Sequence, residues 1–158
     1  MRTVATIGVH GSTLDEFLAG LRDHDVKLVA DVRQRRGVRG AQYAWANSLR
    51  LQAAMKRAQI EYRHLPELAP TTELRHLQYR EDGRQGVGKR TRVALADEYR
   101  HRYLSEVLDR VDLQTVLESF PDEAVSALLC VERDARACHR SLVAERLHEQ
   151  FGVPVVNL

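Results

Sequence analysis

Residues 125–157 run VSALLCVERDARACHRSLVAERLHEQFGVPVVN and contain a strand pattern, a loop, a helix pattern and a second strand pattern. Residues 125–130 form a short apolar run of the kind that a fully buried strand carries. Residues 138–151 then place apolar side chains at helical spacing, and Gly152 stands where such a helix ends. A β-branched run follows at 153–157. This strand–helix–strand order is typical of a parallel sheet with crossover helices.

The N-terminal half shows the same alternation. Strands are expected at residues 3–7 and 28–32, which are apolar or β-branched runs of suitable length, and at residues 60–64, which begin at Ile60. Ser12 predicts the cap of a helix after the first strand, and Asn47 predicts the start of a helix after the second. We therefore predict an α/β fold of three layers with a mostly parallel sheet, Rossmann-like or flavodoxin-like.

A middle segment separates the third and fourth expected strands. Pro66 and Pro70 break the chain, and residues 81–89 (EDGRQGVGK) have three glycines and no apolar periodicity, which predicts a surface loop. Helical spacing starts only after this loop and covers residues 93–108, and Asp112 predicts the cap of a further helix. The sequence therefore predicts a helical insertion between strands three and four.

Length and composition limit the class of protein. The 158 residues suit one α/β domain, 1–158, and 44% hydrophobic with 29% charged residues is ordinary for a globular protein. No apolar run approaches the roughly 20 residues that a membrane helix needs, so we expect no membrane partner. The N-terminus enters a strand directly, which favours a cytoplasmic location. The net charge of +2 is small, so phosphate binding would depend on local clusters of cations.

Polar residues follow four of the expected strands directly. In open parallel sheets, ligands bind beyond the carboxyl ends of the strands, so these residues predict a site at that edge of the sheet. They are His10 and Ser12 after the first strand, Asp31 and Arg33 at the second, His64 and Glu67 at the third, and Cys130 and Glu132 at the fourth.

Cys138 is expected to open the last helix, with His139 and Arg140 beside it. The helix dipole and the cationic neighbours favour a thiolate there, so Cys138 is a candidate nucleophile with His139 as its base. Arg140 is a candidate ligand for a bound anion at the same helix end. Alternatively, Cys138 packs inward as a small apolar side chain. If the first interpretation holds, Cys138 should be alkylated faster than Cys130.

Two further interpretations of the cysteines have less support. Cys130 and Arg136 have the C-x5-R spacing of thiol phosphatases, but the intervening VERDA contains two acids and no glycine to form a phosphate cradle. A metal site would need Cys138, His139 and His10 in addition to Cys130, and this spacing matches no common zinc signature. We therefore expect no metal and no cofactor.

Three carboxylates are candidates for proton transfer or for orienting a substrate. Glu67 and Glu132 are the expected general bases, because partial dehydration at a strand end raises a carboxyl pKa. Asp31 and Arg33 either orient a substrate and clamp an anion, or form an ion pair that fastens the loop.

The segment after the second strand is rich in arginine, and we call residues 33–39 the arginine loop. Within it, Arg33, Arg36 and Arg39 precede Tyr43 and Trp45, and cations beside aromatic rings suit phosphates and stacked bases. The alternative is a solvated loop that the two aromatic side chains anchor. A second group of cations, Arg84, Lys89, Arg90 and Arg92, lies in the middle segment.

Four stretches together resemble the domain-of-unknown-function family four-eight-eight. They are TIG at 6–8, DVR at 31–33, IEYRHLPEL at 60–68 and LLCVERDARACHRSLVAERL at 128–147. The chain departs from the family at 34–48, where many relatives have proline and serine, and at Ala69, where a glycine is usual. The resemblance implies the same parallel α/β fold and no known reaction. By this match, the motif positions are Asp31, Arg33, His64, Glu67, Cys130, Glu132, Cys138, His139 and Arg140.

These residues favour an enzyme that acts on a phosphate-bearing nucleotide or nucleic acid. The arginine loop would hold phosphate, and Glu67 or Glu132 would handle the proton during hydrolysis of a bond to the base. One alternative is a thiol enzyme that depends on Cys138. Another is a module that binds nucleotides or nucleic-acid ends without turnover.

Overall fold

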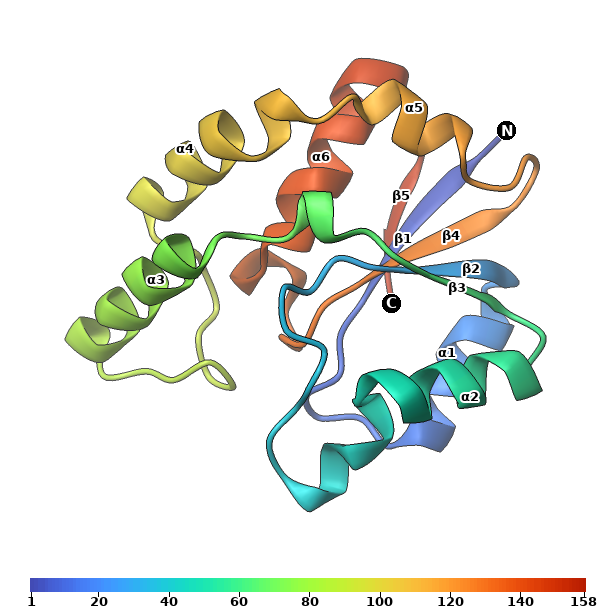
Figure 1. Cartoon of the computed structure of the whole chain (residues 1–158), viewed down its shortest axis with the longest axis horizontal. Coiled ribbons are helices and arrows are strands. Elements are labelled where there is room, and N and C mark those ends of the chain that lie inside the picture. The colour runs from blue at the N-terminus through green and yellow to red at the C-terminus, as the bar shows by residue number, and fades with distance from the viewer.

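The computed structural model describes residues 1–158 and contains one five-stranded sheet in the order β3-β2-β4-β1-β5. Every pair of neighbouring strands is parallel, and helices cover both faces, which gives the three-layer α/β architecture that the sequence predicts (Figure 1). The strands are β1 (Thr3–Ile7), β2 (Val26–Asp31), β3 (Glu61–His64), β4 (Val125–Leu129) and β5 (Val155–Asn157). The helices are α1 (Leu14–Asp23), α2 (Ser48–Arg57), α3 (Thr72–Gln85), α4 (Asp97–Glu106), α5 (Leu113–Glu118) and α6 (His139–Phe151).

Helices α1 and α2 cover one face of the sheet (Figure 1). Phe17 of α1 and Met55 of α2 share a buried apolar cluster with Val29 of β2 and Ala127 of β4. Helices α3 to α6 cover the opposite face and form a second buried apolar cluster. Leu28, next to Val29 on β2, points into this second cluster. Successive side chains of a strand point to opposite faces, so a strand covered on both sides must be apolar throughout.

The five predicted strands are confirmed, with boundaries that differ by no more than two residues. The insertion between β3 and β4 is also helical and consists of α3, α4 and α5. No helix in the structure is both long enough and apolar enough to cross a membrane.

Two local predictions need correction. Residues 81–85 do not belong to a loop but complete α3, which ends at Gly86 in the left-handed conformation. The cap of α1 is Thr13, not Ser12: the Thr13 side chain accepts from the backbone N–H of Glu16, and the Glu16 carboxylate accepts from the Thr13 backbone. The Ser12 N–H instead donates to the Val9 carbonyl and closes the turn before the helix.

Candidate functional site

The carboxyl ends of four strands lie level along one edge of the sheet. Leu129 of β4 pairs with both Ile7 of β1 and Asp31 of β2, and Asp31 also pairs with His64 of β3. Since β4 lies between β1 and β2, the loop that follows β4 leaves from the middle of this edge.

A pocket of about 570 Å³ lies beyond this edge. Residues 130–139 and the arginine loop contribute to one side of its lining. α3 and the segment between α3 and α4 contribute most of the other side, including Arg75, Gln78, Lys89 and Leu95. The pocket is therefore built from the sheet edge on one side and the helical insertion on the other.

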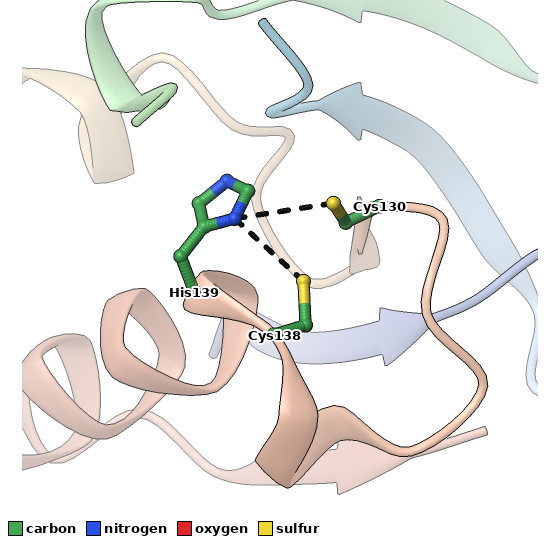
Figure 2. Close-up of side chains that lie close together, drawn as sticks. All are labelled: Cys130, Cys138 and His139. Carbon is green, nitrogen blue, oxygen red and sulfur yellow. Dashed lines mark hydrogen bonds between the residues drawn. The ribbon is translucent and has the colours of Figure 1, made fainter. Parts of the chain in front are cut away.

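Cys130, Cys138 and His139 form a buried cluster in the lining of the pocket (Figure 2). Nδ1 of His139 lies 3.6 Å from Sγ of Cys138 and 3.9 Å from Sγ of Cys130. Nε2 of His139 lies 2.8 Å from the Val32 carbonyl oxygen, which can only accept a hydrogen bond. The proton of a neutral His139 therefore resides on Nε2, and the Nδ1 lone pair faces the two sulfur atoms.

Both thiols are buried, with 6% of Cys130 and 2% of Cys138 exposed. Cys138 caps α6, and its Sγ accepts from the backbone N–H of Arg140. Its position at the helix start is as predicted, but its side chain packs inward. A hydrogen bond with Cys138 and burial together raise the pKa of the Cys130 thiol well above its ordinary value.

Glu132 is the one carboxylate in the lining of the pocket. Its Oε1 accepts from Nη2 of Arg92 at 2.8 Å, and the Arg92 Nη1 donates to Asp82 of α3 at 2.7 Å. Burial alone would raise the pKa of Glu132, but the charges of Lys89 and Arg92 outweigh it and lower the pKa to about 2. The predicted rise in pKa is therefore wrong for Glu132, because the side chain is buried next to the positive charges of Lys89 and Arg92.

His10 also lines the pocket and is buried. Burial, assisted by Lys89, Arg90 and Arg92 and opposed by Glu132, lowers the pKa of His10 to about 4. Its Nδ1 is buried and has no hydrogen-bond partner. His10 is therefore a neutral imidazole in the wall of the pocket, with one ring nitrogen that has no hydrogen-bond partner in the protein.

Asp31 and Arg33 form a fully buried ion pair, which corrects the expectation that Arg33 grips phosphate. Both carboxylate oxygens of Asp31 accept from the Arg33 guanidinium at 2.8 Å, and the remaining Arg33 nitrogen donates to the Ala46 carbonyl. Tyr62 also donates to Asp31. Of the two roles open to this pair, the structure supports the one that fastens the loop.

Arg140 and His64 also hold backbone rather than facing the pocket. The Arg140 guanidinium is buried and donates to the carbonyl oxygens of Glu132 and Arg133, at 2.7 and 3.2 Å. The Glu132 carbonyl also passes so close to Gly8 that an added Cβ would lie 2.2 Å from it. Nε2 of His64 lies 2.9 Å from the Arg33 carbonyl oxygen, so His64 supports the arginine loop.

Several other predicted site residues lie outside the pocket lining. Glu67 is exposed on the 3₁₀ turn Pro66–Leu68, which carries its side chain away from the strand end. Ser12 and Arg36 are not in the lining either, and Arg36 donates to the Tyr62 hydroxyl. Trp45 packs on the Phe17 ring, with 5.0 Å between ring centroids, rather than standing free for a base.

Tyr43 anchors the arginine loop beside the pocket. Its hydroxyl accepts from the Gly11 N–H at 2.8 Å, and the Arg90 guanidinium lies over its ring at 5.2 Å from the centroid. Arg90 also donates to the Arg39 carbonyl. Tyr43 thus connects the first strand's loop, the arginine loop and the helical insertion.

The cations of the pocket come largely from residues that the sequence did not assign to the site. Arg39 was predicted and Arg35 lies in the predicted arginine loop, whereas Arg75, Lys89 and Arg90 were not predicted. The only signal for Lys89 and Arg90 was their membership of the second basic cluster. None of the five forms an ion pair with a carboxylate, whereas Arg92 is fully paired.

The chain is a parallel α/β protein with a pocket at the carboxyl edge of its sheet, and cations and a Cys-Cys-His cluster line this pocket. The chain belongs to the family described as Domain of unknown function DUF488, whose model matches residues 13–147. No curated protein and no solved structure matches the chain. The family description states no reaction, so the function has to be argued from the residues of the pocket.

Proposed function

We propose that the chain is an enzyme that binds a phosphate-bearing nucleotide or nucleic acid in the pocket and hydrolyses a bond to the base. The observation that carries this proposal is the uncompensated charge of the lining. Five cationic side chains face the pocket without a carboxylate partner: Arg35, Arg39, Arg75, Lys89 and Arg90.

Such a concentration of charge is unusual in a chain whose net charge is only +2. Like charges held around one cavity repel one another, and a bound polyanion relieves this repulsion. Arg75 is already oriented by hydrogen bonds to Gln34 and Tyr79, so its guanidinium has little freedom to lose when a phosphate binds. The arrangement favours phosphate groups over neutral ligands.

The inner part of the pocket offers polar groups of another kind. His10 is neutral near pH 7 and has a free Nδ1, which can hydrogen-bond to a sugar or a base. A pocket of this volume is in the range that holds one small ligand. We therefore assign the phosphates to the cationic rim and the base or sugar to the side of His10.

Glu132 is the carboxylate that we propose to act on the bond to the base. With a pKa of about 2 it is a weak base, so proton abstraction is not its best role. An ionised carboxylate instead stabilises the positive charge that develops on a sugar carbon as the bond to the base breaks. Glu67 has no part in this proposal because it lies outside the pocket.

A thiol enzyme is the second candidate, and one distance favours it. Nδ1 of His139 is 3.6 Å from Sγ of Cys138 and has its lone pair directed there, so His139 can accept the thiol proton. In either case we propose a cytoplasmic location, where a reducing environment would keep both free thiols reduced.

Binding is tested by measuring the affinity for a single-stranded oligonucleotide and for a mononucleotide across a salt series. Each phosphate contact contributes about 0.7 to the slope of log affinity against log salt for a single strand. Arg39→Ala should reduce the slope by about that amount. Arg36→Ala is the matched control, because Arg36 is in the same loop but outside the pocket lining, and it should leave the slope unchanged. No binding of either ligand at low salt would exclude the proposal.

Catalysis is tested by analysing the same mixtures for a released base. A hydrolase of the proposed kind should lose turnover in Glu132→Gln and retain it in Cys138→Ser, and a thiol enzyme should show the reverse. Salt-dependent binding with no product from any nucleotide or oligonucleotide would instead identify a binding module.

A further inference from the structure

The Cys130, Cys138 and His139 side chains have a geometry that the proposed reaction does not require. Their two sulfur atoms and Nδ1 all lie within 4.8 Å of one another, although Cys130 comes from the end of β4 and the other two from the start of α6 (Figure 2). Each directs its ligand atom to the same point beside the pocket.

The two nitrogen–sulfur distances in this cluster are close to the edge length of a tetrahedron around one ion. With Zn–S bonds of about 2.3 Å and a Zn–N bond of about 2.05 Å, tetrahedral angles place N and S about 3.6 Å apart. The observed Nδ1–Sγ distances are 3.6 Å to Cys138 and 3.9 Å to Cys130.

The surroundings orient these side chains in the way that metal ligands are oriented. Histidine ligands usually donate their other ring N–H to a carbonyl or carboxylate, and His139 Nε2 donates to the Val32 carbonyl at 2.8 Å. The Cys138 sulfur accepts the Arg140 backbone N–H, a bond that stabilises a thiolate. The Tyr103 ring packs edge-on against His139 and completes an apolar wall around the cluster.

We propose that Cys130 Sγ, Cys138 Sγ and His139 Nδ1 bind one Zn²⁺ ion, with the fourth coordination position open to the pocket. Two thiolates and one imidazole are ligands that zinc prefers, and three protein ligands with one open position are typical of catalytic rather than structural zinc. This inference differs from the sequence-based expectation of no metal.

Charge balance explains how a cationic pocket accommodates a dication. Binding forms two Zn–S bonds and one Zn–N bond and releases the two thiol protons to solvent, so the net charge of the cluster does not change. Cys130 Sγ donates to Glu132 Oε2 at 3.3 Å in the metal-free chain. Once that proton has left, Oε2 would be free to accept a hydrogen bond from a water at the open position.

The zinc site does not depend on the proposed nucleotide chemistry, since it is tested without any nucleotide. It does bear on the choice between the two candidate reactions. A zinc-bound Cys138 thiolate would not be a free nucleophile, so zinc binding would count against the thiol enzyme.

The experiment is an anaerobic titration of the reduced, metal-free chain with Co²⁺, followed by displacement with Zn²⁺. We expect one Co²⁺ per chain, a thiolate-to-cobalt charge-transfer band, intense visible bands of a tetrahedral ion, and loss of all bands on adding one equivalent of Zn²⁺. Zn²⁺ should also raise the Tm of the wild-type chain, a readout that needs no variant. Sub-stoichiometric binding, or binding without the charge-transfer band, would overturn the proposal.

Variants locate the site. Cys130→Ser, Cys138→Ser and His139→Gln should each weaken binding by at least about 100-fold, since even the groups that orient a ligand contribute 10- to 100-fold. His24→Gln is the matched control: His24 is exposed, contacts the Gly20 carbonyl at the end of α1, and should bind metal as the wild type does. Equal binding by His139→Gln and His24→Gln would place the ion elsewhere and refute the site.

Discussion

Arg92 and Glu132, forty positions apart in the chain, form a buried ion pair with 2.8 Å between Nη2 and Oε1. Arg92 belongs to the segment between α3 and α4, and Glu132 to the loop after β4. The same guanidinium holds Asp82 of α3. One arginine therefore ties the helical insertion to the sheet edge and fixes the two sides of the pocket relative to each other.

Arg92→Ala should lower the free energy of unfolding by about 3–5 kcal/mol, because it leaves two buried carboxylates without a cation. Arg136→Ala is the matched control, since Arg136 pairs with Asp134 at the surface, where an ion pair contributes at most about 1 kcal/mol. Urea denaturation of both variants measures the difference. Similar losses in the two variants would show that the buried network is not what holds the insertion.

The free energy of unfolding should decrease in two steps as the pH is lowered, and each step should come from a different residue of the pocket. Glu132 has a pKa of about 2 in the folded chain against an ordinary 4.5, so its contribution is complete above about pH 4.5 and is lost as pH falls toward 2. His10 has a folded pKa of about 4 against an ordinary 6.5, so the unfolded chain takes up its proton first and stability declines below about pH 6.5. Denaturation at a series of pH values should show that Glu132→Gln flattens the lower step and His10→Gln the upper one. If both variants keep the wild-type profile, the assignment of these steps is wrong.

Gly8→Ala should destabilise the chain by at least about 1–3 kcal/mol, because its Cβ would lie 2.2 Å from the Glu132 carbonyl oxygen and would displace the loop after β4. Gly20→Ala provides the opposite case. Gly20 lies within α1, and an added Cβ there would meet no atom within 4 Å, so alanine should stabilise the helix by about 0.5–1 kcal/mol. Thermal melts of the two variants should shift in opposite directions, and a shift in the same direction would contradict the role given to Gly8.

Both thiols should react slowly with iodoacetamide in the folded, metal-free chain, because both are buried. Cys138 should still react before Cys130, since the pKa of Cys130 is raised and Cys138 receives the Arg140 N–H at the helix start. Peptide mass spectrometry after timed alkylation measures each rate, and the urea-unfolded chain gives the reference. A Cys130 rate equal to or above the Cys138 rate across pH 6–9 would remove the thiol-enzyme candidate.

The central strands could be predicted because strands buried on both faces are mostly apolar, and the short run 125–129 carries that pattern between turn residues. Helix α3 could not, because only Leu74 and Leu77 among its residues form an apolar contact with the core. Its remaining buried side chains are polar: Gln78 donates to Asp82, and Asp82 accepts from Arg92. Hydrogen bonds between segments hold this helix, and hydrophobic periodicity does not register them.

The candidate site, like the fold, could be predicted from the sequence only in part. Its place at the carboxyl edge follows from the parallel sheet, and Cys130, Glu132, Cys138 and His139 all line the pocket as the sequence analysis expected. The opposite side of the pocket depends on α3, so Arg75 could not be foreseen. The sequence also does not indicate which cations form ion pairs, because partners such as Arg92 and Glu132 lie far apart along the chain.

The strand order has a consequence for the synthesis of the chain. β1 has only β4 and β5 as neighbours, and both are made long after β1. β2 and β3 can pair as soon as β3 has emerged from the ribosome, whereas β1 keeps both of its hydrogen-bonding edges open until residues 125–157 have been made. An open apolar strand is prone to pair with other chains, so the nascent protein depends on rapid closure of its C-terminal end or on a chaperone that holds β1 in the meantime.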